Sequence, residues 1–210
     1  MGVVDNLKWR YATKRFNKNK KIPTEEIEYL KEAVSLIPSS NGLQPYKVLI
    51  VENKELREKL REASWGQPQI TEASHIFIFC NFTEYGPDKV DAFIRLGAEI
   101  NNYPPESSKD YAESLNAQIA AKSPEQLSNW TAKQAYIALG SLITAASELK
   151  IDSCPMEGFL PKKYNEILGL NEKGMTAAAV CALGYRSDED QNRLLKKVRK
   201  PINDLCPVLK

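Results

Sequence analysis

The sequence predicts an α+β domain, because short apolar strands alternate with long helical stretches along the chain. None of the ten glycines forms the GxGxxG turn of a dinucleotide-binding unit, and no GxxxxGK[ST] phosphate loop is present. No composition shift or low-complexity linker marks a domain boundary, so residues 1–210 are expected to form a single domain. Because both glycine-rich phosphate-binding motifs are absent, any phosphate-bearing ligand is expected to be held by side chains.

The first half of the chain contains two predicted strands set between helices. Thr24 opens a helix because Glu25 and Glu26 follow it, and apolar residues continue at helical spacing to Ile37 before Pro38. Runs of β-branched and aromatic residues then indicate strands, and charged amphipathic stretches indicate surface helices. These elements are a strand at 46–51, a helix at 53–63, a strand at 75–82, and helices at 88–100 and 107–122.

The clearest helix start in the sequence lies at Ser123. Pro124 follows at the first helical position and Gln126 stands at the capping-box position, and the helix runs to about Lys150. Residues 135–146 are nearly all apolar or small, so both sides of this helix are expected to be buried, as in a central helix at a dimer interface. The remaining elements are a strand at 151–154, a helix at 161–168, a strand at 175–183, and an extended tail in which Pro201 and Pro207 break any helix.

Composition and charge exclude several classes of protein. Lys and Arg total 29 against 27 for Asp and Glu, and this net charge of +2 is too small for a nucleic-acid-binding surface. The four cysteines stand far apart without metal-ligand spacing, so no metal site is expected. His75, the only histidine, opens an apolar strand and is expected to serve the structure. No secretion signal or membrane-spanning run is present, which favours a cytoplasmic protein with reduced thiols.

Two short basic runs stand at opposite ends of the chain. Residues 10–14 carry Arg10 and Lys14, and residues 196–200 include Lys197 and Arg199. Arginine offers a planar fork that matches phosphate oxygens, and lysine supplies a mobile point charge. If the fold brings the runs together, four or more cations converge, and this predicts a site for a phosphate-bearing ligand. For either run alone, a solvated surface remains an alternative interpretation.

Six segments in order resemble the FMN-dependent nitroreductases, over nearly the whole chain from about residue 7 to residue 199. Each segment is weak alone, and the six together at compatible spacing are specific. They are Arg10-Tyr11-Ala12-Thr13-Lys14, residues 38–46, Ala73-Ser74-His75, residues 130–134, residues 155–159 and Lys197-Val198-Arg199.

The resemblance implies a nitroreductase-like three-layer α/β/α sandwich around a mixed, mainly antiparallel sheet. It also implies a long central helix at a dimer interface and an extended C-terminal tail. The expected assembly is a homodimer with two tightly bound FMN molecules at the subunit interface, and each site takes residues from both chains. Neither nucleic acid nor a membrane is expected as a partner.

The resemblance assigns most of the cofactor contacts by position. Arg10, Lys197 and Arg199 would hold the FMN phosphate and ribityl chain, and Tyr11 and Ala12 would supply backbone contacts. The other cofactor positions are Lys14 near the pyrimidine edge, Pro38, Ser39, Ser40 and Gly42 from the other subunit, Gln67 and Gln69 at the polar edge of the ring, and Pro155, Glu157 and Gly158 against its face. For Gln67 and Gln69, a role as ordinary loop residues stays open.

The chemistry of FMN gives two of these residues a further role. Two-electron reduction leaves negative charge near N1 and O2 of the flavin, and the Lys14 ammonium would stabilise it. No residue is expected to act as nucleophile or general acid, so Lys14 and Glu157 are interpreted as groups that tune the flavin, and no catalytic residue is assigned.

The implied activity is an FMN-dependent oxidoreductase that uses NADH or NADPH to reduce nitroaromatics, quinones or related flat acceptors by a ping-pong mechanism. Residues 107–122 correspond to a lid over the flavin in relatives, although core packing explains them equally well. A flavin or dihydropteridine reductase on the same scaffold and a non-catalytic FMN-binding protein remain alternatives. The candidate substrate residues are Asn41, Trp65, Tyr103 and Tyr111.

Overall fold

The computed structural model describes residues 2–209, and its centre is an antiparallel sheet. Within those residues the sheet has four strands in the order β1-β2-β4-β3, and each strand pairs antiparallel with its neighbours. The only parallel pairing described is an isolated bridge between Ala12 and Ser153. The strands are β1 (Tyr46–Val51), β2 (His75–Phe82), β3 (Asp152–Met156) and β4 (Met175–Gly184).

Side chains of the central strand β2 alternate between two hydrophobic cores. Ile76 and Ile78 belong to one core together with Leu60, and Phe77 and Phe79 belong to the other. All four of these β2 side chains are at most 1% exposed. Because successive strand residues point to opposite faces, a strand that is apolar at every position must be covered on both sides.

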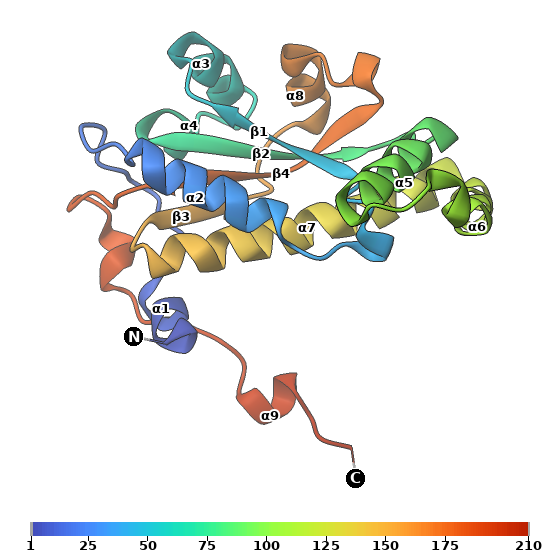
Figure 1. The fold of residues 1–210 in the computed structure, drawn as a ribbon. Coiled ribbons are helices and arrows are strands. Elements are labelled where there is room, and N and C mark those ends of the chain that lie inside the picture. Colours follow the sequence, from blue (N-terminus) through green and yellow to red (C-terminus); the bar gives the residue numbers. More distant parts are fainter. Residues whose placement is uncertain (1, 210) are drawn as a thin grey trace.

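Helices cover both faces of the sheet, as Figure 1 shows. The apolar sides of the covering helices pack on the sheet, so the sequence-based expectation of a three-layer α+β sandwich is confirmed. One layer consists of α2 (Thr24–Ser35) and α7 (Pro124–Glu148), and the other consists of α3 (Lys54–Glu62), α4 (Gln69–Glu72) and α8 (Pro161–Leu168).

The long helix α7 begins at the capping box that the sequence indicates. Ser123 Oγ accepts the N–H of Gln126 at 3.2 Å, and the Gln126 side chain accepts the Ser123 N–H at 2.9 Å. Leu142 is fully buried against the sheet, whereas Tyr136 and Ile137 are 39% and 46% exposed. Within one chain only one side of α7 meets the sheet, so burial of its other side, as expected for a dimer interface, stays a prediction.

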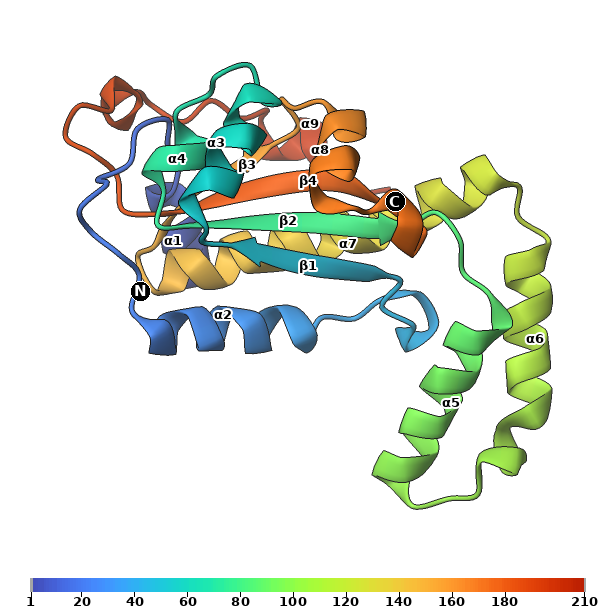
Figure 2. The same cartoon turned by 90° about the horizontal axis from the view of Figure 1, so that it is seen from above.

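A pair of helices projects from one end of the sheet, as Figure 2 shows. They are α5 (Pro87–Asn101) and α6 (Lys109–Ala120), joined through a 3-10 turn at Pro105–Ser108. Val90 and Ile94 of α5 pack with Leu115 and Ile119 of α6 in a third hydrophobic core, which also includes Leu43 and Tyr85. These apolar contacts hold the two projecting helices together.

The two ends of the chain contain short helices that the sequence analysis did not predict. They are α1 (Val3–Trp9), a 3-10 turn at Gln191–Leu194 and α9 (Ile202–Leu205). The expectation of a wholly extended tail is wrong, because α9 follows Pro201 directly. A proline is tolerated at a helix start, since the backbone N–H that it lacks would have no partner within the helix. The strand expected at 151–154 is observed as β3 at Asp152–Met156. The short helix α4 is a further element without a sequence-based prediction.

Asp190 ties the two ends of the chain to each other. Asp190 is only 1% exposed. Its carboxylate accepts hydrogen bonds from the backbone N–H groups of Lys14 at 2.8 Å and Arg15 at 3.4 Å, and from the Tyr11 hydroxyl at 3.1 Å. Burial alone would raise the pKa of Asp190, but the N–H donors of Lys14, Asn192 and Arg15 outweigh it and hold this pKa below its usual range. The ionised carboxylate is therefore the form that holds residues 11–15 in place.

We expect Asp190→Asn to lower the free energy of unfolding at pH 7 by about 1–3 kcal/mol, because an amide offers fewer acceptor sites to these buried donors. Since the folded pKa of Asp190 lies below the unfolded value, its contribution is present above about pH 4 and is lost as the pH falls through the folded pKa. Urea unfolding from about pH 7 down to pH 3 should show the two proteins converging. Asp188→Asn, at an exposed position, is the control. If the difference in unfolding free energy between wild type and Asp190→Asn grows as the pH falls, this assignment is contradicted.

Candidate functional site

The structure brings the two basic runs together beside α1. The Lys197 ammonium donates to the backbone carbonyls of Leu7 and Arg10. Burial, and then the charges of Arg10 and Arg199, lower the pKa of Lys197. Burial is also the main cause that lowers the pKa of Arg10, and the Arg199 charge adds to it. Three cations from distant parts of the sequence thus lie close enough to repel one another.

Polar atoms without partners lie next to these cations. Arg10 Nη2 donates to the Ser153 carbonyl at 3.3 Å, but Arg10 Nε is buried and has no hydrogen-bond partner in residues 2–209. The Ser153 hydroxyl is likewise buried and unpaired within the described part of the chain. Buried polar groups are costly when they are unpaired, so these atoms have hydrogen-bonding capacity left for a polar, anionic ligand. Ala12 lies beside them through its backbone bridge to Ser153.

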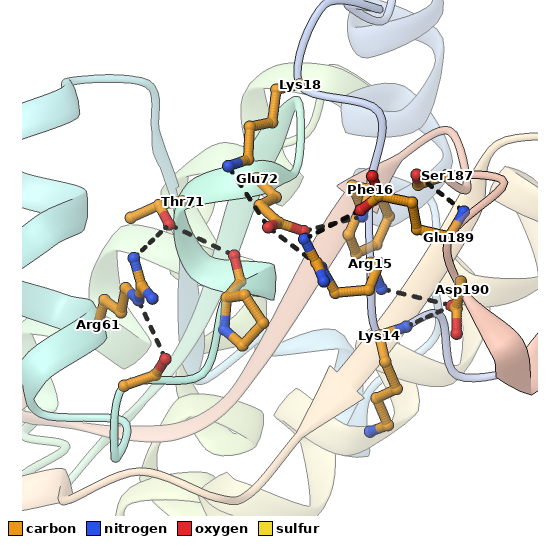
Figure 3. Close-up of polar contacts among 12 residues, drawn as sticks. Lys14, Arg15, Phe16, Lys18, Arg61, Thr71, Glu72, Ser187, Glu189 and Asp190 are labelled. Carbon is orange, nitrogen blue, oxygen red and sulfur yellow. Dashed lines mark hydrogen bonds and ion pairs between the residues drawn. The ribbon is translucent and has the colours of Figure 1, made fainter.

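Lys14 points away from Asp190 and toward β3, as Figure 3 shows. Its ammonium donates to Cys154 Sγ at 3.7 Å, and Gln69 Nε2 lies 3.9 Å from the same sulfur. Burial raises the pKa of the Cys154 thiol even though the Lys14 charge opposes this, so the sulfur is a neutral, weak acceptor. The Lys14 and Gln69 donors are therefore left with capacity to bind another group.

Gln67, Gly158 and Trp65 form the neighbouring wall. Gln67 Nε2 donates to the Gly158 carbonyl at 2.6 Å, and Gln69 Nε2 donates to Gln67 Oε1 at 3.4 Å. A Cβ on Gly158 would lie 2.9 Å from Gln67 Nε2 and 3.1 Å from Trp65 Cζ3, so a larger residue here would have to displace these two side chains. Trp65 is 67% exposed and offers a flat apolar face beside the glycine.

Glu157 is held by a residue that the sequence analysis did not single out. The Tyr136 hydroxyl on α7 donates to Glu157 Oε1 at 2.6 Å. Burial, followed by the Glu157 hydrogen bond and charge, raises the pKa of Tyr136 to about 12. Tyr136 lies in a nearly continuous apolar stretch of the sequence, and no local signal marks it as polar support for Glu157. Pro155 lies on strand β3, next to Cys154 and two residues before Glu157.

Several candidate residues lie elsewhere in the single chain. The loop of Pro38, Ser39, Ser40, Asn41 and Gly42 follows α2 at the end of the sheet remote from α1, as Figures 1 and 2 agree. There the N–H of Ser40 donates to Gln134 Oε1 at 2.8 Å, which anchors the loop to α7. Tyr103 and Tyr111 belong to the projecting α5 and α6 region. One chain alone therefore does not bring these residues to the basic cluster.

Neither a metal-binding cluster nor a membrane-spanning helix is found among the described residues. Within residues 2–209, His, Cys, Asp and Glu side chains do not gather in threes in an arrangement that could hold a metal ion. In the same range, each helix is too short or too polar to cross a bilayer.

Comparison with known proteins gives the family. The family model described as "Nitroreductase family" matches residues 7–185. A Bacillus subtilis protein provisionally named NAD(P)H nitroreductase YfkO is 35% identical over 217 residues, with 97% of this chain and 95% of that protein covered. A Staphylococcus epidermidis protein, also provisionally named an NAD(P)H nitroreductase, is 38% identical over 215 residues, covering 97% of this chain and 94% of that one.

Solved structures share the fold. A structure from Exiguobacterium sibiricum, provisionally described as a nitroreductase in complex with FMN, has a TM-score of 0.86 at 20% identity, covering 100% of this chain and 98% of that one. Another from Staphylococcus epidermidis, provisionally described as an NAD(P)H:FMN oxidoreductase, has a TM-score of 0.88 at 22% identity, with 99% and 96% covered. The family match over most of the chain and these full-length relatives lead to one conclusion: the chain belongs to the nitroreductase family of oxidoreductases.

Proposed function

We propose that residues 1–210 form one FMN-binding domain of an oxidoreductase that uses NADH or NADPH to reduce nitroaromatics, quinones or related flat acceptors. The observation that carries this proposal is the convergence of Arg10, Lys197 and Arg199 beside unpaired buried donors. A related solved protein is described as an FMN complex, and curated relatives carry NAD(P)H in their names. Flavin and nicotinamide cofactors both bear phosphate, which suits this charge.

The residues present fit FMN. Arg10, Lys197 and Arg199 would hold the phosphate, since fixed cations with spare donors form charge-assisted hydrogen bonds to phosphate oxygens. Lys14 and Gln69 would donate to the polar edge of the ring, because their present partner is a weakly accepting thiol. FMN, when bound, supplies two-electron transfer between the nicotinamide and the acceptor.

Glu157 and Gly158 would lie at the face of the ring. Glycine at 158 lets Gln67 and Trp65 pack close to the backbone, and these two side chains border the space proposed for the ring. The hydrogen bond from Tyr136 keeps the Glu157 carboxylate in one position at the edge of this space. These residues position and tune the cofactor, and Trp65, whose ring is largely exposed, is available to stack on a flat acceptor.

The proposed assembly is a homodimer in which each site takes residues from both chains. Two observations support it. The Pro38–Gly42 loop is remote from the basic cluster within one chain, so it can reach such a cluster only on a second copy. The outer side of α7 and the tail expose large apolar residues, among them Ile137, Leu195 and Val198, which a second copy would cover. The projecting α6 with Tyr111, and Tyr103 and Asn41, would then be candidates for the acceptor side of the site.

A cytoplasmic location belongs to the same proposal. All four cysteines are free, and Cys80, Cys154 and Cys181 are buried, as in proteins from reducing compartments.

The test of the proposed function is the visible spectrum of the protein purified without added cofactor, followed by anaerobic addition of NADH and, separately, NADPH. We expect a flavin band near one FMN per chain that bleaches with at least one donor. Steady-state rates with a nitroaromatic, a quinone, free flavin and a dihydropteridine then identify the acceptor. A colourless protein that takes up no FMN would contradict the proposal, and a yellow protein that neither donor bleaches would reduce it to FMN binding.

We expect Lys14→Met to slow flavin reduction by NAD(P)H by about 10- to 100-fold, because the variant removes a cation next to developing negative charge. Stopped-flow absorbance of the FMN-loaded protein measures the rate, and an unchanged thermal midpoint shows that the fold is retained. Lys8→Met, an exposed position on α1, is the matched control. Reduction of Lys14→Met at the wild-type rate would show that Lys14 has no tuning role.

A further inference from the structure

A second basic hollow lies outside the candidate flavin site. It has a volume of about 510 Å³ and lies between residues 18–21, the first turns of α3 and the start of β2. Its lining includes four basic side chains, Lys18, Lys21, Lys54 and Arg57, against two carboxylates. The volume is within the range of small-molecule sites. None of the residues assigned to the flavin lines it.

Two of the lysines are available to a ligand. Within the described part of the chain, the ammonium groups of Lys21 and Lys54 make no hydrogen bond or ion pair, whereas Lys18 lies 3.5 Å from Glu72. Partial burial, and then the charges of Arg57 and Lys54, lower the pKa of Lys21. The hollow thus concentrates like charges at a cost that an anion would offset.

Arg57 supplies a fixed positive charge at the floor. The residue is 4% exposed, and its guanidinium donates to the carbonyls of Ile70 at 2.6 Å, Ala73 at 2.6 Å and Ser74 at 3.2 Å. Among residues 2–209 it forms no ion pair; burial lowers the pKa of Arg57, and the charge of Glu58 opposes this. A buried guanidinium held mainly by carbonyl groups adds positive potential to the space above it.

His75 completes the floor and reports on the hollow. Its Nε2 lies 2.8 Å from Glu52 Oε1, and its Nδ1 lies 3.0 Å from Ser74 Oγ, which also accepts the N–H of Ile22 at 2.9 Å. The ring is therefore fixed in place with its edge at the lining. Since His75 is the only histidine in the sequence, the NMR signals of imidazole ring protons can be assigned to it directly.

We propose that this hollow is a binding site for the phosphate group of a small molecule, with Lys21 and Lys54 as its principal ligands. A phosphate brings up to two negative charges and three acceptor oxygens, which suits two free ammonium groups over a fixed guanidinium better than a single carboxylate does. The site is separate from the one proposed for FMN. Figure 3 shows Lys18 directed to Glu72 on one side, while Lys14 extends the other way.

The test follows the His75 ring signal by NMR while pyrophosphate is added to the purified full chain carrying one FMN equivalent. We expect a saturable shift and a rise in the pKa of His75, because a nearby anion favours the imidazolium. Burial is the main cause that lowers this pKa in the free protein, with Arg57 and Lys21 adding to it and Glu52 opposing it. Sodium chloride at equal ionic strength should not reproduce the shift.

Two double variants test the assignment of ligands. Lys21→Gln with Lys54→Gln should weaken pyrophosphate binding by about tenfold or more, since each lysine removed takes away a charge-assisted contact. Lys162→Gln with Lys173→Gln removes the same charge from exposed positions outside the hollow and should leave the affinity unchanged. A His75 shift that never saturates would overturn the proposal, and so would an equal loss of pyrophosphate affinity in both double variants. Unchanged thermal midpoints confirm that both variants fold.

The source of the phosphate is settled by comparing inorganic phosphate, AMP, ADP and adenosine in the same titration. Tighter binding of ADP than of pyrophosphate would assign the hollow to a nucleotide, and equal binding would assign it to the phosphate group alone. Both results support the site. Binding of adenosine as tight as that of ADP would overturn it, because the lysines would then contribute nothing.

Discussion

The carboxylate of Asp190 is the contact on which the candidate site depends, because it joins the two ends of the chain. It follows β4 and binds the backbone of Lys14 and Arg15, so the N-terminal basic run lies next to the segment that leads into the C-terminal run. Lys197 can then reach the carbonyl of Arg10. Burial is the main cause that lowers the pKa of Arg10 and of Lys197, and the charge of Arg199 adds to it in both. Functional sites commonly concentrate such perturbed groups.

Much of the fold could be predicted from local sequence patterns, since they are the same patterns that determine it. The strands at Tyr46–Val51 and His75–Phe82 and the helix at Pro161–Leu168 have the predicted bounds. These segments carry strong periodicity or clear breakers. The short α1 and α9 lack both, because a helix of one or two turns buries too little to leave a pattern.

The site was predictable only in part, because its supports are tertiary contacts. Basic runs and the resemblance to a family indicate Arg10, Lys14 and Lys197, whose residue types suit phosphate. Tyr136 beneath Glu157 and Asp190 beside Lys14 carry no local signal, because their partners lie 21 and 176 residues away in the sequence. The basic hollow was missed for the same reason: it combines three segments that are each unremarkable alone.

The most direct test of the central claim is a heterodimer made by co-expressing two differently tagged chains. One carries Lys14→Met and the other carries Ser40→Trp, a bulky side chain in the loop proposed to reach the partner's flavin. If each site combines the basic cluster of one chain with the loop of the other, one site receives both defects and the other receives neither. We therefore expect half of the sites in the heterodimer to bind FMN and be reduced at the wild-type rate. If both sites are defective and no wild-type fraction appears, each site is built within one chain and the account is wrong.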